Sequence, residues 1–412
     1  MREGLRAPKD ATILVTDSRR GSAIAVIRSL GRRGWRVIAA DSLPSNPGFS
    51  SRYVRGRLVY SPPETAPGEF IDDLLRAARE KAVDLIIPVT DDVILPLSAA
   101  RSRFDGVCKL ALPRATSLDV VTNKLKTIQL AAELGVPTPL TRLVHSTEEA
   151  LDQARSLGWP LVLKPLASRL YRDRAAVEAF EVSYAENRER LTKQMRLFEG
   201  KCPVLLQEYY RGVGYGVELL MHEGRPLSAF QHKRLREIPI NGGASTFRQS
   251  VPLDPDLYRH SIRLLQNLRW TGLAMVEFKV GRAGARLMEI NGRVWGSLPL
   301  AVHSGVDFPV LLAEMYLSGP PDPQAPPAAP YKAGIRSRSL LLDMVWIGQV
   351  LLGHPRYPFL EMPSRRQALT ALLQLLNPAY KFDIQSLDDP QPGIVDIFNI
   401  VGRFAAELKK AM

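Results

Sequence analysis

The chain of 412 residues has little cysteine and no recognisable zinc pattern. Its two cysteines, Cys108 and Cys202, are too few and too far apart for a disulfide framework or a cysteine-based zinc site. Its six histidines show no ligand spacing, so we do not expect zinc. Because low cysteine use is typical of a reducing compartment, we expect a cytoplasmic protein.

Long apolar runs are also missing. The most apolar stretch, residues 340–352, contains Asp343 and Gln349 and is too short to cross a bilayer. We expect a buried helix there. Contact of this helix with a membrane surface is the alternative, because Arg338 precedes it and Trp346 lies inside it.

Acidic side chains are fewer than basic ones. The 55 lysines and arginines against 42 aspartates and glutamates give a net charge of +13, which predicts anionic partners such as nucleic acid, a membrane face, or small phosphates and carboxylates. Basic residues are most in excess in residues 1–60, where a solvated basic surface is an equally good explanation. No basic–aromatic interleaving or known motif supports nucleic-acid binding, which we therefore disfavour.

Alternating strand and helix patterns fill residues 12–111. This rhythm predicts a parallel sheet with helices on its faces, and hence a Rossmann-like domain over residues 1–116. The turn after the first strand, residues 17–22, lacks the G-x-G-x-x-G fingerprint, which disfavours a nicotinamide site.

Three regions follow this first domain. We predict a second domain over residues 117–318, a stiff proline-rich linker over 319–330, and a mostly helical extension over 331–412. The fold class is therefore α/β and α+β.

Two lysines occupy positions suited to phosphate binding. The sequence has no G-x-x-x-x-G-K-[ST] loop, which excludes a P-loop nucleotidase. Lys124 opens a predicted helix, and Lys164 lies in an apolar strand where a buried ammonium needs an anion. A surface position for Lys124 and a structural ion pair for Lys164 are the alternatives.

An apolar strand over residues 203–210 turns polar at its end, at Gln207, Glu208, Tyr209 and Tyr210. Such a segment, called the hinge below, can lay an adenine on apolar side chains and offer polar groups to its edge. An ordinary hairpin is the alternative.

The most informative segment lies over residues 273–293. Glu289, Asn291 and Arg293 are spaced by two and therefore share one face of a strand. Glu277 joins that face if its strand pairs with theirs. Two carboxylates and an amide form an oxygen site suited to Mg²⁺ on nucleotide phosphates, and Arg293 is suited to a transferring phosphoryl group. A salt-bridged pair of strands is the alternative.

With these pieces in order, residues 12–318 resemble the ATP-grasp superfamily, especially its biotin-carboxylase and carbamoyl-phosphate-synthase-like branch. The resemblance implies an ATP-grasp fold over 117–318 with ATP between two subdomains. It implies that ATP is bound by Lys124, Lys164, Gln207, Glu208, Tyr209 and Tyr210. It also implies Mg²⁺ or Mn²⁺ on Glu277, Glu289 and Asn291, and the acyl-phosphate at Arg293. Glu208 and Glu218 are both candidates for the ribose.

One departure from the family pattern concerns the loop after Lys164, which has no glycine where family members have a glycine-rich phosphate lid. Arg169, Arg172 or Arg174 could supply charge there instead. A basic cluster, Lys233, Arg234 and Arg236, is a candidate for binding the acceptor carboxylate; a solvated hairpin is the alternative.

The resemblance implies an ATP-dependent ligase that activates a carboxylate as an acyl-phosphate and joins it to an amine or similar nucleophile. A bicarbonate- or carbamate-activating enzyme and a nucleotide-binding protein without ligase activity are the alternatives. The expected partners are small carboxylates and amines, and the sequence leaves a homodimer open.

Overall fold

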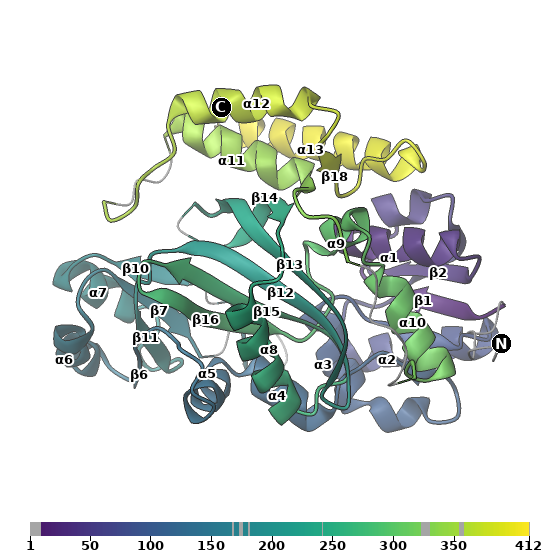
Figure 1. Cartoon of the computed structure of the whole chain (residues 1–412), viewed down its shortest axis with the longest axis horizontal. Coiled ribbons are helices and arrows are strands. Elements are labelled where there is room, and N and C mark those ends of the chain that lie inside the picture. The colour runs from purple at the N-terminus through teal and green to yellow at the C-terminus, as the bar shows by residue number, and fades with distance from the viewer. Residues whose placement is uncertain are drawn as a thin grey trace.

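The computed structural model describes residues 10–166, 169–172, 176–179, 182–240, 242–322, 330–353 and 358–411. Residues 169–172, 176–179 and 403–411 are described by their backbone alone. The chain contains three main sheets, with a layer of helices above them formed by its C-terminal part (Figure 1).

The first sheet is parallel and has the strand order β3-β2-β1-β4-β5. Its first strand is buried at every residue, as expected for a strand covered on both faces. The parallel sheet predicted from the alternating pattern is confirmed. Its strands are β1 (Thr12–Val15), β2 (Arg36–Asp41), β3 (Val54–Val59), β4 (Leu85–Ile87) and β5 (Lys109–Leu110). Its helices are α1 (Gly21–Arg32), η1 (Pro47–Ser50), α2 (Pro67–Glu80), α3 (Asp91–Ala99) and η2 (Arg101–Phe104).

A small antiparallel sheet, of order β10-β7-β11-β6, follows in the chain. One of its faces packs its apolar side chains against α6 and α7. Its strands are β6 (Thr141–Val144), β7 (Leu161–Pro165), β10 (Ser183–Ala185) and β11 (Val204–Glu208). The accompanying elements are α4 (Ala115–Thr122), α5 (Lys124–Glu133), α6 (Thr147–Leu157), α7 (Arg188–Met195) and the hairpin of β8 (Arg169–Arg172) and β9 (Ala176–Ala179).

The large sheet has seven strands in the order β16-β15-β12-β13-β14-β17-β18. Two of these strands, β17 and β18, come from beyond residue 330, so the C-terminal extension adds to the sheet as well as covering it. The strands are β12 (Val213–His222), β13 (Arg225–Ile238), β14 (Ala244–Ser250), β15 (Gly272–Gly281), β16 (Gly284–Asn291), β17 (Arg336–Arg338) and β18 (Lys381–Phe382). The helices of this part are α8 (Pro255–Asn267), α9 (Leu298–Ser304) and α10 (Phe308–Ser318).

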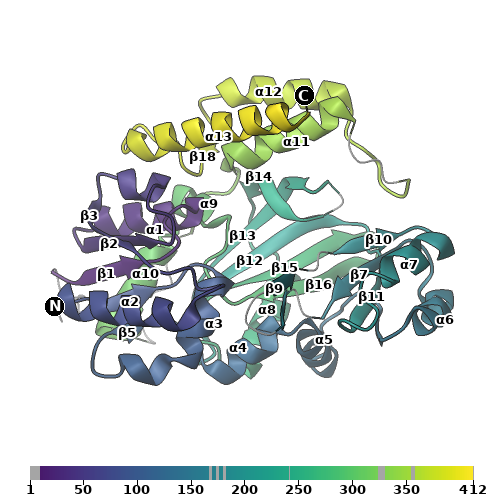
Figure 2. The same cartoon turned by 180° about the vertical axis from the view of Figure 1, so that it is seen from behind.

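The two faces of the large sheet bury different side chains. One face packs Val217, Val276 and Ile290 into a core shared with α4, α5 and α8. The other contributes Phe230 and Met275 to a core that also holds the first sheet, α1, α9 and α10. The parallel sheet and the large sheet are therefore joined by a common core. Figure 2 shows the molecule from behind.

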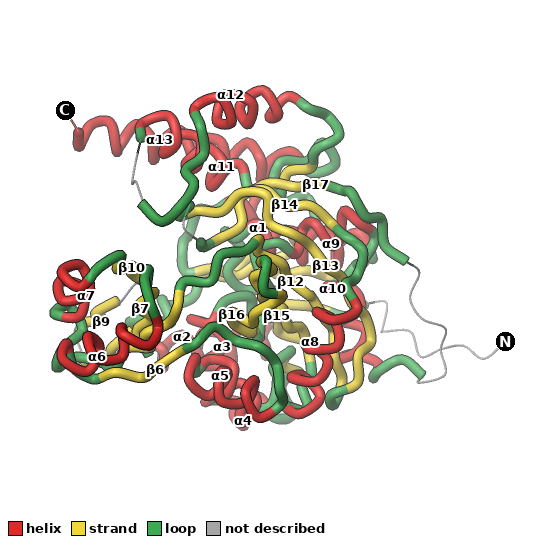
Figure 3. Tube along the Cα trace, turned by 60° about the vertical axis from the view of Figure 1, so that its left-hand side comes forward, coloured by secondary structure: helices red, strands yellow, loops and turns green. Residues whose placement is uncertain are grey.

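The remaining helices form the C-terminal layer, which comprises α11 (Leu340–Leu352), α12 (Arg365–Leu373), η3 (Gln374–Leu376) and α13 (Pro390–Ala411). This layer lies at the top of the molecule in Figures 1 and 3. The fold class is confirmed: a parallel N-terminal sheet, the antiparallel sheets and C-terminal helices.

The apolar stretch over residues 340–352 is the helix α11, which is buried on one side and exposed at Leu352. Trp346, Ile347 and Val350 pack against Ala368 and Ala371 of α12. No single helix among the described residues is long and apolar enough to cross a membrane. The sharply bent pair of α9 and α10 is long and apolar enough when the two helices are taken together, by length and composition only.

A buried ion cluster attaches α11 to the large sheet. Arg236 donates to both carboxylate oxygens of Asp343, at 2.8 Å each, and Arg338 donates to Asp343 Oδ2 at 3.0 Å. The Asp343 side chain is fully buried and also accepts a hydrogen bond from the Thr246 hydroxyl at 3.1 Å. Two arginines therefore compensate one carboxylate away from water.

Replacing Asp343 with alanine leaves these two arginines without their carboxylate. Breaking a buried pair of this kind costs about 3–5 kcal/mol. We expect Asp343→Ala to lower the midpoint of thermal unfolding clearly, measured by differential scanning fluorimetry. Asp256→Ala removes the exposed partner of Arg259 and should leave the midpoint nearly unchanged. Equal midpoints in the two variants would contradict a structural role for the cluster.

Candidate functional site

The β15–β16 hairpin brings the predicted acidic residues together. Glu277 lies directly opposite Glu289, and Met275 lies opposite Asn291. Glu277, Glu289 and Asn291 therefore share one face of the large sheet, as their spacing predicts. Glu277 is buried and Glu289 is exposed, so the pair runs from the interior to the surface.

Asn291 links the two carboxylates. Its amide nitrogen donates to Glu277 Oε1 at 3.0 Å and to Glu289 Oε1 at 3.1 Å, while its oxygen accepts from Arg293 Nη2 at 3.2 Å. Gly292 stands between Asn291 and Arg293 because a Cβ there would lie 2.4 Å from the Trp270 ring. A glycine is thus required for the hairpin strand to pass over Trp270.

The charges at this face influence one another strongly. Burial raises the pKa of Glu277 to about 7, and the charge of Glu289 adds to this effect while Arg234 opposes it. Desolvation would also raise the pKa of Glu289, but the Asn291 hydrogen bond and the charge of Lys164 outweigh it and lower that pKa. An additional cation between the carboxylates would favour their ionised forms.

The oxygen atoms of this face fit a divalent cation. No group of three or more His, Cys, Asp and Glu side chains among the described residues could hold a metal by itself. Glu277 and Glu289 supply carboxylate oxygens, and a half-turn of the Asn291 amide would present its oxygen to the same place. Three oxygen donors suit Mg²⁺ or Mn²⁺, which complete their shells with water and phosphate oxygens.

Lysines surround the acidic face. Burial lowers the pKa of Lys164 to about 8, and the charges of Lys124 and Lys279 lower it further, whereas Glu289 raises it. Lys124 begins α5, whose first turn is capped by the Asn123 side chain. The charges of Lys124, Lys279 and Glu289 therefore all influence the ionisation of Lys164.

The hinge residues lie at the end of β11. Gln207 is buried and donates to Thr141 Oγ1 at 2.8 Å, and Glu208 Oε1 accepts from the Leu140 amide at 3.0 Å. The Tyr210 hydroxyl donates to the Gly284 carbonyl at 2.6 Å, which ties the hinge to the β15–β16 turn.

Comparisons with known proteins agree with this geometry. Residues 201–339 match a family model described as "ATP-grasp in the biosynthetic pathway with Ter operon". The chain is 27% identical over 291 residues to the carbamoyl phosphate synthase large chain of Xanthomonas axonopodis pv. citri, a match that covers 67% of this chain. These matches assign residues 201–339 to the ATP-grasp superfamily, with distant similarity to the synthase over a longer stretch.

Solved structures share the fold. The biotin carboxylase–β,γ-ATP complex from Campylobacter jejuni has a TM-score of 0.60 at 17% identity, covering 79% of this chain and 74% of that one. The L-amino acid ligase from Bacillus licheniformis has a TM-score of 0.58 at 16% identity, covering 75% of each chain. The match to the synthase large chain covers only 26% of that protein, so its activity is not transferred.

One predicted residue of the ATP-grasp site is enclosed. Glu218 is fully buried, with its Oε1 atom 2.7 Å from His232 Nδ1 and within 3.2 Å of the donating Ser297 hydroxyl. Burial raises the pKa of Glu218. Gly216 leaves room for this arrangement, because a Cβ there would lie 2.5 Å from the His232 ring. Of the two ribose candidates, only Glu208 is partly exposed.

The three residues of the predicted basic cluster are separated by the structure. Arg234 pairs with Glu277 and donates to Glu237 at 3.0 Å, so it faces the acidic site. Lys233 lies on the opposite face of β13, and a bulge between Arg234 and Arg236 turns Arg236 away towards Asp343. Only Arg234 of the three lies at the site.

Residues from distant segments also reach the site. Arg293 donates from Nε to Asp91 Oδ2 at 2.8 Å, and Asp91 begins α3 of the parallel-sheet domain. A small pocket beside Arg293 is also lined by Pro88 and Gly292. Asp91 lies in an acidic pair shortly after β4, but nothing in the sequence pairs it with Arg293.

The C-terminal part of the chain reaches the hinge through Phe359. Its ring lies 5.0 Å from that of Tyr209 and 5.9 Å from that of Tyr184, and its carbonyl accepts from Arg211 Nη2 at 2.7 Å. Tyr184 lies opposite Val162 in the small sheet, on the face turned away from the α6–α7 core. Phe359 is thus packed beside the hinge, and no local sequence pattern points to this contact.

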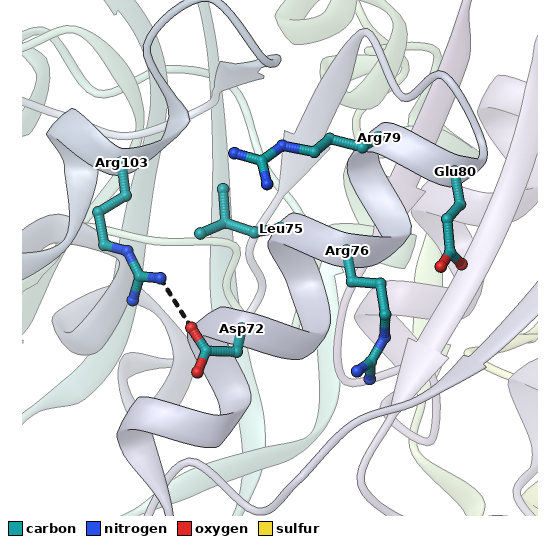
Figure 4. A pocket seen from close by; sticks show the side chains of 6 residues that line it. All are labelled: Asp72, Leu75, Arg76, Arg79, Glu80 and Arg103. Atoms are coloured by element: carbon teal, nitrogen blue, oxygen red, sulfur yellow. Dashed lines mark hydrogen bonds and ion pairs between the residues drawn. The ribbon is translucent and has the colours of Figure 1, made fainter.

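The Arg169 and Arg172 side chains, and Arg174 altogether, fall outside the described residues. A surface pocket on α2 and η2, where Arg103 pairs with Asp72 at 2.7 Å, shares no residue with the site (Figure 4).

Changing Glu289 to glutamine tests the metal assignment. The amide keeps the size of the side chain but removes a negative charge, so we expect Mg²⁺-dependent binding of ATP to weaken about tenfold or more. Calorimetric titration of ATP with Mg²⁺ and with EDTA measures this. Glu148→Gln makes the same change at an exposed position of α6 and should bind as the parent protein does. Unchanged Mg²⁺ dependence in Glu289→Gln would refute the assignment.

Proposed function

We propose that this ATP-grasp enzyme is a ligase that activates a carboxylate with ATP and joins it to an amine. The observation that carries the proposal is the single face on which Glu277, Glu289 and Asn291 meet Arg293, with Lys164 close by. This is an arrangement for holding a metal–phosphate complex and stabilising the charge that moves during phosphoryl transfer.

The residues divide the work of the first step. A carboxylate oxygen of the substrate attacks the γ-phosphorus, the bond to the β,γ-bridging oxygen breaks, and ADP leaves with an acyl-phosphate formed. Mg²⁺ on Glu277, Glu289 and Asn291 would neutralise phosphate charge during this transfer. Lys124 and Lys164 hold the phosphates, and Arg293 stabilises the oxygens of the transferred group.

The second step replaces phosphate by the nucleophile. The amine attacks the acyl carbon, the bond between that carbon and the phosphate oxygen breaks, and the amine loses a proton as phosphate leaves. Arg293 can interact with the departing phosphate. Arg234, which pairs with Glu277, is our candidate for contacting the carboxylate substrate.

Asp91 explains how Arg293 keeps its orientation for both steps. The guanidinium contacts the Asp91 carboxylate through Nε and the Asn291 oxygen through Nη2. These contacts fix it between the parallel-sheet domain and the proposed metal-binding face. Fixed donors of this kind need little reorganisation when charge develops.

The relatives support this reading and leave one alternative. The fold is shared with an L-amino acid ligase, which favours a carboxylate and an amine as substrates. It is also shared with biotin carboxylase, and the synthase relative makes carbamoyl phosphate by name. Activation of bicarbonate or carbamate is therefore the second candidate.

Product formation on a substrate panel tests the function. We expect ADP and phosphate to be released from MgATP when amino acids or other small carboxylates are supplied with amines, with a condensed product detected by mass spectrometry. In the same assay Arg293→Ala should lower kcat at least about a hundredfold and change the KM for ATP much less, because the interaction strengthens in the transition state.

Three results decide between the candidates. Release that requires bicarbonate alone would favour the second candidate, and no release with any acid would favour a nucleotide-binding protein. Normal turnover of Arg293→Ala with saturating substrates would remove Arg293 from the mechanism. Arg282→Ala, an exposed arginine in the turn before β16, is the control and should react as the parent does.

In this proposal Phe359 supports the hinge, which binds the adenine base of ATP. It packs on Tyr209 beside the hinge, so Phe359→Ala should loosen the hinge and raise the KM for ATP about tenfold while kcat changes little. Steady-state kinetics at varied ATP measure both values. Leu387→Ala, at a fully exposed position of the same part of the chain, is the control. A lowered KM would instead mean that Phe359 obstructs the base.

A further inference from the structure

The C-terminal layer carries two exposed apolar stripes. Each stripe follows a spacing of three and four residues, which places its members on one helical face. The first lies on α12 and η3 and consists of Leu369, Leu372, Leu373 and Leu376. The second lies on α13 and consists of Ile394, Ile397, Phe398 and Val401. Leu373 is 71% exposed and Phe398 is 72% exposed.

The opposite faces of these helices are fixed by packing. Ala368 and Ala371 bury one side of α12 against α11. On α13 the buried side includes Asp396, which accepts a hydrogen bond from Gln385 Nε2 at 2.8 Å. In water a surface helix usually buries its apolar side chains and exposes its charged ones, whereas α13 buries an aspartate and exposes a phenylalanine. An exposed apolar face of this kind is typical of a binding surface.

The described aspartates near the stripes all have partners. Asp383 pairs with Arg248 and Asp389 with Arg28, both buried, whereas the pairs of Asp388 with Arg32 and Arg52 are exposed. Asp396 is hydrogen-bonded, so most of the aspartate charge here is compensated, and Glu361 before α12 is an exposed carboxylate.

The cations of the layer face outward instead. Arg365 and Arg366 are exposed at the start of α12, and Lys381 is exposed between the two stripes in the chain. The whole protein carries a net charge of +13. A second copy would set like charges against one another, whereas an anionic surface would be attracted.

We propose that the outer faces of α12 and α13 dock on an anionic lipid bilayer. The two stripes enter the boundary between headgroups and acyl chains, and Arg365, Arg366 and Lys381 meet the lipid phosphates. Both helices belong to the C-terminal layer, which lies at one end of the molecule in all three views (Figures 1, 2 and 3). This inference is independent of the proposed reaction.

Sedimentation of the whole protein with vesicles tests the proposal. We expect the protein to bind phosphatidylcholine vesicles that contain phosphatidylglycerol, to bind pure phosphatidylcholine much less, and to be partly released by added salt. The double variant Leu373→Ser/Phe398→Ser should lose at least about tenfold in affinity for the anionic vesicles.

A matched variant and a second measurement keep the test decisive. Leu197→Ser changes a similarly exposed leucine near α7 and should bind vesicles as the parent does. The thermal unfolding midpoint of the double variant should not fall, because both side chains are exposed. Equal binding by the parent and the double variant would overturn the proposal. So would a dimer, seen by analytical ultracentrifugation, that the double variant abolishes while the parent ignores vesicles.

Discussion

Two glutamates placed opposite each other on neighbouring strands determine how the rest of the site is built. Glu277 and Glu289 repel each other when both are ionised, and the buried one cannot rely on water. Their face therefore needs cations, which Arg234 and Lys164 supply in part. A divalent ion and the phosphates it brings would complete the balance, so the sheet is prepared for a charged ligand before one binds.

Two segments that are distant in the sequence also contact residues of the proposed ATP site. Asp91 comes from the parallel-sheet domain and Phe359 from beyond the large sheet, yet each contacts a residue of the proposed ATP site. The common core beneath them keeps the parallel sheet and the large sheet in a fixed relation. Arg293 and Tyr209 are consequently held by parts of the chain that contribute no other proposed residue to catalysis.

The periodicity of the sequence predicts the parallel sheet and part of the candidate site, but it does not predict strand bulges or contacts between distant segments. The spacing of Glu289 and Asn291 correctly predicts their shared strand face, and the alternating pattern predicts the parallel sheet. The same spacing predicts Arg293 on this strand, but β16 ends at Asn291 and Arg293 lies just beyond it. Closeness in sequence also suggests one basic cluster of Lys233, Arg234 and Arg236, but alternation and a bulge in β13 separate them. Bulges depend on the pairing of neighbouring strands, and contacts such as Arg293 with Asp91 depend on the whole fold, so neither is visible in a local pattern.

The distribution of charge gives the C-terminal layer its unusual character. Asp343, Asp383 and Asp389 each pair inward with an arginine, and these pairs attach the layer to both the large sheet and the parallel-sheet domain. Carboxylates used in this way no longer offset the lysines and arginines outside. The apolar stripes are left beside an excess of positive charge. A surface that is both apolar and cationic is poorly suited to water alone or to an identical copy, and it is well matched to a layer of anionic lipid.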